Sequence, residues 1–369
     1  MNHQKYMQIA IDEAKKGIGF VAPNPLVGAV IVKDDNIIGV GYHQRYGENH
    51  AEVNAILDAK KDNKDIKNST IYVTLEPCSH YGKTPPCADA IIKEGIKKVV
   101  IGCTDTNSLV AGRGIEKLKE AGIEVVENIL EDECRKLNEV FFHYINSKKP
   151  FIVMKYAMSM DGKIATSSGK SKWISNSKSR ESVHYFRKQY SAIMVGINTV
   201  INDNPMLDCR IENPRNPIRI ILDSSLKIDL FSNICKTAKD IKTYIATISD
   251  DEDKIKSLEK LGIEIIKTSA LNNRVNIKEL INILGRDKNI DSILVEGGSS
   301  VNASLLKERL VNKILIYIAP KIFGGFSSKT PIADIDIDDP NNAILLVDGV
   351  IKNIDNDLFL EYYLDYKNY

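Results

Sequence analysis

The sequence predicts an α/β protein built from two domains. Helical and extended segments alternate along the chain, which is typical of layered α/β folds. A length of 369 residues exceeds what one typical hydrophobic core serves, so about two domains are expected. The polar segment 146–150 ends in a proline that cannot continue the preceding helix. We therefore expect a first domain at residues 1–147 and a second at 148–369.

Hydrophobic periodicity places the elements of the first domain. It predicts helices over residues 6–17 and 50–60 and after Pro86, with extended segments over 26–32, 37–42, 70–74 and 98–102. This order indicates a layered domain with crossover helices.

The second domain repeats the α/β pattern without any internal sequence repeat. Strands are predicted at residues 151–158, 192–196, 218–222, 293–295 and 314–319, and helices at 179–189, 277–284 and 303–310.

Composition excludes several classes of protein. Lys and Arg number 50 against 49 Asp and Glu, so no overall field attracts nucleic acid or an acidic membrane. The first residues lack an apolar signal core, and no segment approaches the roughly 18 to 20 apolar residues of a membrane helix. We expect a soluble cytoplasmic protein with no nucleic-acid or membrane partner.

The six cysteines do not indicate a disulfide framework. Cys78 and Cys87 lie in a loop rich in Pro and Gly, which suggests metal binding. The other four are expected to be small apolar core residues: Cys103, Cys134, Cys209 and Cys235.

His50, Cys78 and Cys87 have the chemistry of a catalytic zinc site. His50 opens a predicted helix, Cys78 follows a strand, and Cys87 starts another helix. One imidazole and two thiolates leave a fourth position for water, whose pKa the metal lowers toward neutrality. Glu52 can take the proton of that water and deliver it to leaving ammonia. The sequence therefore predicts a hydrolytic zinc deaminase.

A structural zinc site is the alternative interpretation. The known signature of zinc deaminases has two residues between its cysteines, whereas eight residues separate Cys78 from Cys87 here. His80 lies in that longer loop and could complete a closed four-ligand site. Lys83, in the same loop, could instead meet a substrate phosphate.

The chain resembles the bifunctional deaminase/reductase family of riboflavin biosynthesis over nearly its whole length. In the first half the matching motifs are residues 23–28, His43, 50–52, 76–87 and 105–114. In the second half they are residues 155–163, 171–175, 199–205 and 296–298.

This resemblance implies a cytidine-deaminase-like three-layer domain followed by a dihydrofolate-reductase-like domain. The first would use Zn²⁺ to deaminate the pyrimidine ring of 2,5-diamino-6-ribosylamino-4(3H)-pyrimidinone 5′-phosphate. The second would reduce the ribosyl group to ribityl with NADPH. A homo-oligomer is also expected.

The resemblance also implies site residues. Asn24, His43, Lys83, Asp105 and Asn107 would line the deaminase pocket. Ala157, Trp173, Thr199 and Asp203 would face NADPH, and Ser171, Arg187, Leu207, Arg210 and Glu296 would hold the substrate. Lys155 is our candidate for orienting the reduced substrate.

Physical reasoning supports some of these positions and leaves alternatives for others. Gly298, Ser299 and Ser300 connect a strand to a helix, so their backbone N–H groups can face a pyrophosphate, or they simply form a tight turn. Trp173 could be a core residue, and Arg187 could belong to a solvated helix face.

Two segments depart from the family pattern. Thr106 and Ser108 stand where the family usually has prolines, so that loop loses two fixed φ angles. Asp208 replaces the usual Thr and places an acid beside Arg210, the residue expected to hold phosphate.

Two other functions compete with this prediction. The zinc motif alone also fits a deaminase of nucleotides or transfer-RNA bases with an accessory domain, but the second domain argues against it. A zinc-stabilised binding protein without turnover is the other rival, and Glu52 beside a three-ligand site argues against that.

Overall fold

The computed structural model describes residues 2–81, 85–106 and 112–367. The chain forms two compact units, Met1–Lys148 and Lys149–Tyr369, and the sequence-based boundary lies one residue earlier. Over the described ranges, no helix has the length and apolar character needed to cross a membrane.

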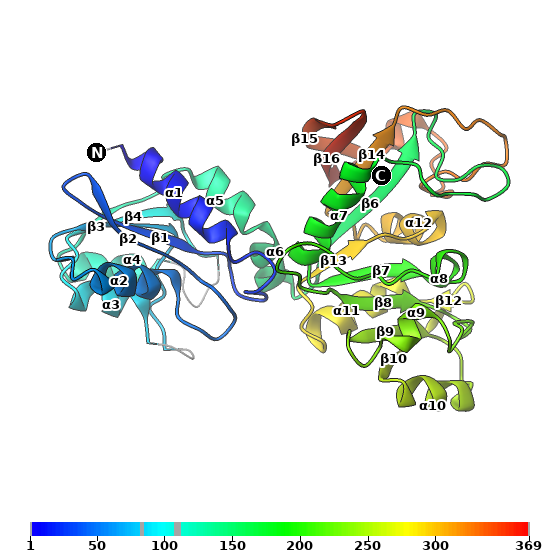
Figure 1. Ribbon diagram of the computed structural model, residues 1–369, viewed down its shortest axis with the longest axis horizontal. Helices are drawn as coiled ribbons and strands as arrows, with labels where there is room; N and C mark the ends of the chain where they lie inside the picture. The colour runs from blue at the N-terminus through cyan, green and yellow to red at the C-terminus, as the bar shows by residue number, and fades with distance from the viewer. Residues whose placement is uncertain (1, 82–84, 107–111, 368–369) are drawn as a thin grey trace. The chain divides into compact units, whose positions relative to one another are not determined.

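Unit 1 contains a five-stranded sheet in the order β2-β1-β3-β4-β5 (Figure 1). Its strands are β1 (Gly28–Lys33), β2 (Asn36–Tyr42), β3 (Thr70–Leu75), β4 (Lys98–Cys103) and β5 (Glu124–Val126). β1 is antiparallel to β2 and β3, whereas β3, β4 and β5 run parallel.

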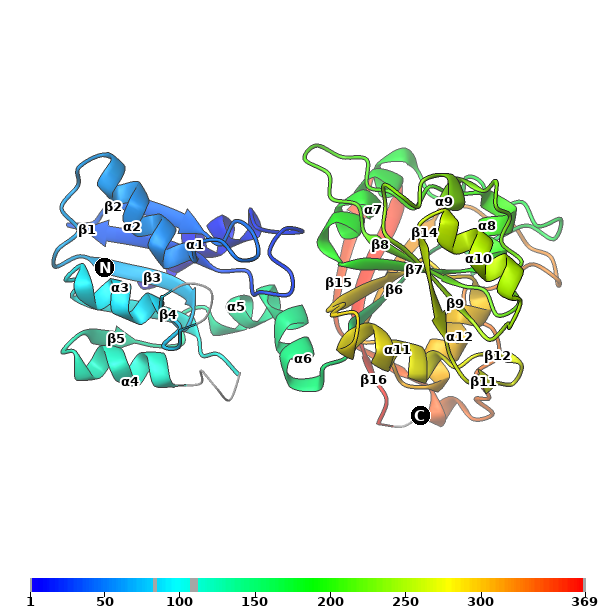
Figure 2. The ribbon, with the colours of Figure 1, turned by 90° about the horizontal axis from the view of Figure 1, so that it is seen from below.

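Helices cover both faces of this sheet because its strands are apolar on both sides. The helices of unit 1 are α1 (His3–Lys15), α2 (Ala51–Lys61), α3 (Cys87–Lys93), α4 (Arg113–Glu120), α5 (Glu131–Leu137) and α6 (Glu139–Ser147). Ile71 and Val73 of β3 pack with α2, α3 and α4, whereas Tyr72 between them packs with α1 and α5. The alternation of side chains along a strand thus produces the three layers that are visible in Figure 1. Figure 2, seen from below, shows α2, α3 and α4 in front of the sheet.

Unit 2 contains a nine-stranded sheet in the order β10-β9-β8-β7-β13-β6-β14-β16-β15. Its strands are β6 (Phe151–Ser159), β7 (Ala192–Gly196), β8 (Ile218–Leu222), β9 (Thr243–Thr247), β10 (Ile263–Lys267), β13 (Ser292–Val295), β14 (Lys313–Ala319), β15 (Leu345–Ile354) and β16 (Asp357–Asp365). The seven strands from β10 to β14 are parallel, and β16 and β15 add antiparallel pairs. β11 (Ala270–Leu271) and β12 (Arg274–Val275) form a separate small hairpin.

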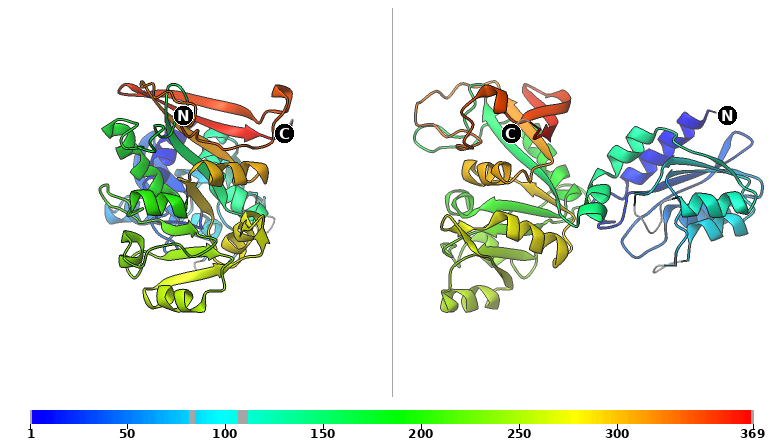
Figure 3. Two further views of the ribbon diagram at one scale, coloured as in Figure 1. Left: turned by 90° about the vertical axis from the view of Figure 1, so that its right-hand side faces the viewer. Right: turned by 180° about the vertical axis from the view of Figure 1, so that it is seen from behind.

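The helices of unit 2 pack on both faces of the large sheet (Figure 3). They are α7 (Ser177–Gln189), α8 (Ile197–Asp203), α9 (Asn233–Lys236), α10 (Glu252–Lys260), α11 (Ile277–Arg286) and α12 (Ser299–Lys307), with a short 3-10 helix at Pro340–Asn342. One core contains side chains of α11 and α12, and the other contains side chains of α8, α9 and α10. Both faces of this parallel sheet are therefore buried, as is usual for such sheets.

The predicted α/β class and most predicted elements are confirmed, with ends shifted by a few residues. The helix predicted at 303–310 is wrong at both ends, because α12 begins at Ser299 and ends at Lys307. Arg309 has a left-handed φ of 52°, which ends the helix. Strands β5, β9, β10, β15 and β16 were not predicted from the sequence.

Candidate active sites

The three predicted zinc ligands meet in unit 1. His50 is the N-cap of α2, Cys78 follows β3, and Cys87 is the first residue of α3. Their ligand atoms all lie within 4.8 Å of one another. His50 Nδ1 is 3.2 Å from Cys87 Sγ and 3.6 Å from Cys78 Sγ. Tetrahedral zinc with ordinary Zn–N and Zn–S bonds requires about 3.5 Å between such atoms, so this donor set fits the ion.

The remaining cysteines and His80 lie away from this cluster. Cys103, Cys134, Cys209 and Cys235 are buried in the cores, as predicted. His80 is exposed, and within the described ranges the cluster contains three side chains. The fourth tetrahedral position is therefore not closed by a described protein ligand, as in catalytic zinc sites.

Glu52 lies in the first turn of α2, two residues after His50. Its side chain is buried, with 3% relative exposure, and its carboxyl contacts the Cys87 thiol. Burial, followed by the nearby Cys78, raises the pKa of Glu52 to about 7. A carboxyl group with a pKa near neutrality can both accept and return a proton.

The thiols of Cys78 and Cys87 differ in acidity, and Cys78 loses its proton more readily. The hydrogen bond from the Cys87 thiol lowers the pKa of Cys78 to about 4, and His50 and the Cys87 backbone N–H act in the same direction. The same contact, followed by burial, raises the pKa of Cys87 well above its ordinary value. Cys78 is therefore the thiolate that attracts a cation first.

Asn24 and His43 lie beside the cluster. The Asn24 side-chain nitrogen is 3.1 Å from His43 Nε2, and the His43 ring packs edge-on against His50 at 5.4 Å. The other ring nitrogen of His43 is 3.0 Å from the Asn49 carbonyl oxygen. Burial lowers the pKa of His43, which favours its neutral form.

Glu76 anchors the loop that carries the predicted pocket residue Asp105. Its buried carboxylate accepts hydrogen bonds from the backbone N–H groups of Asp105, Gly112, Gly114 and Ile115. A Cβ at Gly114 would lie 2.0 Å from the Pro77 carbonyl oxygen, so this close approach requires glycine. Lys83, Asn107 and Ser108 lie outside the described residues.

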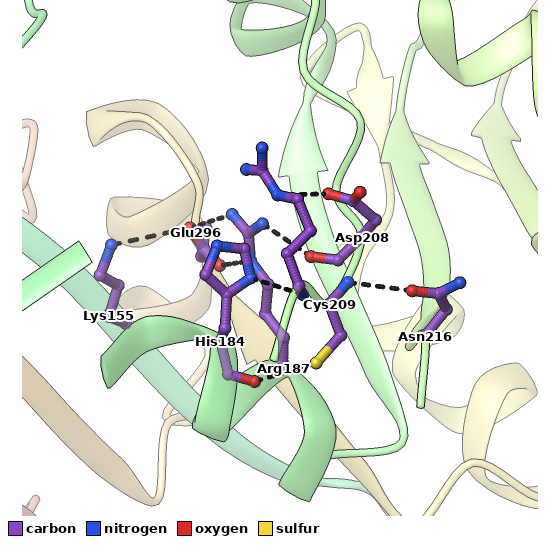
Figure 4. Close-up of polar contacts among 8 residues, drawn as sticks. Lys155, His184, Arg187, Asp208, Cys209, Asn216 and Glu296 are labelled. Atoms are coloured by element: carbon purple, nitrogen blue, oxygen red, sulfur yellow. Dashed lines mark hydrogen bonds and ion pairs between the residues drawn. The ribbon is translucent and has the colours of Figure 1, made fainter. Parts of the chain in front are cut away.

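A second polar cluster lies where β6 and β13 run side by side in the large sheet (Figure 4). Arg187 of α7 donates two hydrogen bonds to Glu296, of 2.7 and 3.1 Å, and Lys155 Nζ of β6 lies 3.6 Å from the same carboxylate. Glu296 follows β13, which lies between β6 and β7. Ligands bind at such crossover points, beyond the carboxyl ends of parallel strands.

The charges of this cluster stabilise one another. Burial alone would raise the pKa of Glu296, but the charges of Arg187 and Lys155 outweigh burial and lower this pKa to about 2. Burial lowers the pKa of Lys155, and the Glu296 carboxylate opposes that shift. Arg187 is thus not part of a solvated helix face, which was the alternative for this residue.

Arg210 lies in the segment that follows α8, and this segment places it beside the cluster. Its backbone N–H donates to His184 Nδ1 at 3.2 Å, and His184 lies one helical turn from Arg187 on α7. The Arg210 side chain is exposed and pairs with Asp208 at 3.3 Å. Leu207, another predicted substrate residue, has its side chain buried in the core.

The residues predicted to bind NADPH lie around the same end of the sheet. Gly298 is the N-cap of α12 and offers no side chain to cap that helix, so the helix start remains open to an anion. A Cβ at Gly297 would lie 2.9 Å from Val301, so the approach of loop to helix requires glycine there. Trp173 is 63% exposed and is not a core residue.

The other predicted residues of this half also surround that end. Ala157 lies in the second half of β6, Thr199 and Asp203 lie in α8, and Ser171 lies in the segment between β6 and α7. Lys172 Nζ pairs with Asp203 at 3.6 Å.

Sequence reasoning missed three residues that support these sites. His184 holds the Arg210 backbone, and its position three residues before Arg187 on one helix face was a usable signal. Asn138 lies 112 residues from Leu26 in the sequence, and its side chain forms two hydrogen bonds with the Leu26 backbone, near Asn24: it accepts from the N–H and donates to the carbonyl oxygen. Tyr317 lies 5.7 Å below the Lys155 ammonium group. No local pattern indicates the last two.

Comparisons with known proteins cover both units. A family model described as "RibD C-terminal domain" matches residues 150–360, and one described as "Cytidine and deoxycytidylate deaminase zinc-binding region" matches residues 1–103. The riboflavin biosynthesis protein RibD of Actinobacillus pleuropneumoniae is 49% identical over 98% of this chain and 95% of its own length. The Aquifex aeolicus protein of the same name is 40% identical over 97% of both chains.

Solved structures agree over the same length. A diaminohydroxyphosphoribosylaminopyrimidine deaminase/5-amino-6-(5-phosphoribosylamino)uracil reductase of Thermotoga maritima has a TM-score of 0.84 and 38% identity, covering 98% of this chain and 99% of that one. The Acinetobacter baumannii RibD, form 1, has a TM-score of 0.85 and 36% identity with the same coverage.

Proposed function

This chain belongs to the RibD family of bifunctional riboflavin-biosynthesis deaminase/reductases, and from that premise we propose which of its residues perform each reaction and on which substrate. Unit 1 is a zinc deaminase and unit 2 is an NADPH-dependent reductase. The observation that carries the proposal is the three-ligand cluster with a buried carboxyl group two residues beyond its histidine.

The proposed deaminase substrate is 2,5-diamino-6-ribosylamino-4(3H)-pyrimidinone 5′-phosphate. Zinc held by His50, Cys78 and Cys87 would supply a Lewis acid and a position for water. Glu52 takes a proton as the water oxygen attacks the ring carbon bearing the amino group. It then gives a proton to that amino group, so the C–N bond breaks and ammonia leaves.

We place the pyrimidine ring against Asn24, His43 and Asp105. The amide of Asn24 and the neutral ring of His43 each offer donors and acceptors to a polar heterocycle. Lys83 and Asn107 belong to the same proposed pocket through the family resemblance alone. The edge-on packing of His43 against His50 supports a substrate position directly over the zinc ligands.

The proposed reductase reaction converts the ribosyl group of the deaminated product to ribityl. When bound, NADPH would supply a hydride to the open-chain C1′ carbon, and uptake of one proton would complete the reduction. Lys155 orients that end of the sugar from β6 and is held by Glu296. The phosphate and sugar are bound by Ser171, Arg187 and Arg210. The Leu207 side chain is buried, so Leu207 would contribute through the backbone of its segment. Ala157, Trp173, Thr199, Asp203 and residues 298–300 hold the cofactor.

We also propose that the chain forms a homo-oligomer. β15 lies at the edge of the large sheet and exposes Leu345, Leu346 and Ile351 at 46%, 42% and 62%. An exposed apolar edge strand favours pairing with another strand. The cytoplasmic location expected from the sequence stays a prediction.

One reaction mixture tests the two activities. It contains the full-length protein loaded with zinc, the diaminopyrimidinone phosphate and NADPH, and both ammonia release and NADPH oxidation are followed. Glu52→Gln should retain zinc, because Glu52 is not a ligand, and should lower ammonia release by at least about a hundredfold. NADPH oxidation should stop for lack of its substrate and recover when the deaminated intermediate is added.

A matched control is Glu120→Gln, which neutralises an exposed carboxylate on α4 of the same unit. It should leave both signals unchanged. Ammonia release by Glu52→Gln at the wild-type rate would contradict the assigned proton transfer. Faster turnover of cytidine or an RNA hairpin than of the pyrimidinone would contradict the proposed substrate.

A further inference from the structure

The segment 207–210 has a backbone that is held on two sides. The Cys209 N–H donates to Asn216 Oδ1 at 2.9 Å, and the Cys209 thiol donates to the His184 carbonyl at 3.3 Å. The Arg210 N–H donates to His184 Nδ1 at 3.2 Å. His184, Cys209 and Asn216 are seen together in Figure 4. Because these hydrogen bonds hold the backbone, we expect a ligand that binds here to move side chains and not the backbone.

Asp208 and Arg210 form an ion pair of unequal partners. Asp208 Oδ1 lies 3.3 Å from Arg210 Nε, and the two side chains are 17% and 66% exposed. Asp208 Oδ1 is itself buried and accepts no hydrogen bond from any described residue. Arg210 is thus the ion-pair partner of Asp208, whose charge also acts on Arg187 and Arg219, and the exposed Arg210 side chain can swing into solvent or toward a ligand.

The other cations of the cluster already have a carboxylate. Glu296 binds Arg187 through both oxygens and lies 3.6 Å from Lys155. Arg187 also donates to the Asp208 backbone carbonyl at 3.0 Å, so Asp208 lies within the same cluster. Glu296 thus pairs with Arg187 and Lys155, and Asp208 pairs with Arg210.

We infer that Asp208 is a specificity-determining residue that competes with the substrate phosphate for Arg210. This inference rests on the proposed function, in which Arg210 binds that phosphate. When the phosphate enters, Arg210 exchanges one anion for another, and the Asp208 carboxylate remains close by as a like charge. Asp208 thereby weakens the binding of phosphorylated sugars and leaves the binding of unphosphorylated ones unaltered.

Asp208→Asn and Asp208→Thr test this in the full-length protein. Both remove the charge, and the first keeps the shape of the side chain. We expect the reductase KM for 5-amino-6-(5-phosphoribosylamino)uracil to fall about two- to fivefold, the size of one exposed charge interaction, with kcat within about twofold. The inhibition constant of ribose 5-phosphate should fall in parallel, whereas that of ribose should not change.

Two further variants separate this effect from others. Glu212→Gln removes an exposed negative charge two residues beyond Arg210 and should leave KM unchanged. Arg210→Met should raise KM. Adding Asp208→Asn to Arg210→Met should lower KM by a smaller factor than Asp208→Asn does in the wild-type protein, because the two side chains act on each other. Thermal unfolding of each variant verifies that the fold is intact.

The outcomes distinguish the inference from the function it rests on. If Arg210→Met raises KM but both Asp208 variants leave it unchanged or raise it, Asp208 does not compete with phosphate and the inference is overturned alone. If Arg210→Met also leaves KM unchanged, the phosphate does not reach Arg210, and the proposed phosphate position fails together with the inference.

Discussion

Glu296 is the residue on which the buried charges of the reductase unit depend. It binds Arg187 twice and lies beside Lys155, and these two cations lower its pKa to about 2 against an ordinary value of 4.5. Removing one member of a buried ion pair leaves the others without compensation, which costs more than the pair itself contributes.

Glu296→Gln should therefore destabilise unit 2 by about 3 kcal/mol near neutral pH. A carboxyl group with a lowered folded-state pKa stabilises the protein above its unfolded pKa of 4.5, and this contribution is lost as pH falls toward 2. The stability difference between wild type and Glu296→Gln should thus narrow by about 2 kcal/mol between pH 7 and pH 3. Urea unfolding at several pH values measures it.

The control for this prediction is Glu259→Gln, which neutralises an exposed carboxylate on α10. Its unfolding free energy should follow that of wild type at every pH. If the difference in unfolding free energy between wild type and Glu296→Gln stays constant down to pH 3, the lost stability comes from packing and not from charge.

At this scale, the sequence identified residues whose chemistry is fixed by type and spacing. His50, Cys78 and Cys87 were found because zinc demands those donors, and the structure brings them together. Their distant supports were not found. His184 was missed although it contacts Arg210 only 26 residues away, and Tyr317 meets α7 through Ser182 across 135 residues. His184 had a local signal, its helical spacing from Arg187, whereas the pairing of Tyr317 with Ser182 depends on the tertiary fold, which no local pattern specifies.

Between elements, the packing of α2 on β2 sets the position of the deaminase chemistry. Gly39 and Gly41 of β2 face this helix, and a Cβ at Gly41 would lie 2.3 Å from the Ala55 backbone nitrogen. No contact that short is tolerated, so a larger residue must push the helix away. Since His50 and Glu52 lie at the start of α2, that shift moves both of them.

Gly41→Ala should therefore impair deamination more than its effect on stability explains. We expect a loss of about 2 kcal/mol in the stability of unit 1 and at least a tenfold lower kcat for ammonia release, because displacement of a catalytic group by about 1 Å can cost a hundredfold. The reductase activity of the same sample, assayed with the deaminated intermediate, should be unchanged.

Gly122→Ala is the matched control for that variant. Gly122 has a φ of 79° and nothing within 4 Å of an added Cβ, so alanine strains the backbone there without moving a helix. It should cost about 1 kcal/mol of stability and leave deamination at the wild-type rate. Equal kcat losses in the two glycine variants would indicate general destabilisation instead of a displaced helix.

Element prediction succeeded where the apolar pattern was unambiguous. The strand at 70–74 was found because every residue of β3 is buried, and α11 was found from its strong amphipathic period. β15 was missed although it begins with a short apolar run, Leu345 to Val347, because Asp348 and Gly349 interrupt that run where the pairing with β16 shifts register. The antiparallel end of the large sheet follows from pairing with β16, which the local sequence does not encode.

For the whole molecule, the two units have separate hydrophobic cores. Two core clusters draw their buried side chains from residues 6–134, and the other two draw theirs from residues 152–316. A unit with its own core can unfold as its own cooperative transition. The two activities are thus carried by parts of the chain whose stabilities should respond to different ligands.

Removal of the metal should lower the stability of one unit alone. A ligand stabilises only the folded form that binds it, and the described zinc ligands all belong to unit 1. Calorimetry of the full chain should show two transitions, with a chelator moving the deaminase transition down and NADPH moving the reductase transition up by several degrees each. Cys87→Ser should reproduce the chelator effect and make that transition insensitive to chelator. A chelator that moved both transitions equally would mean that the two cores unfold as one cooperative unit.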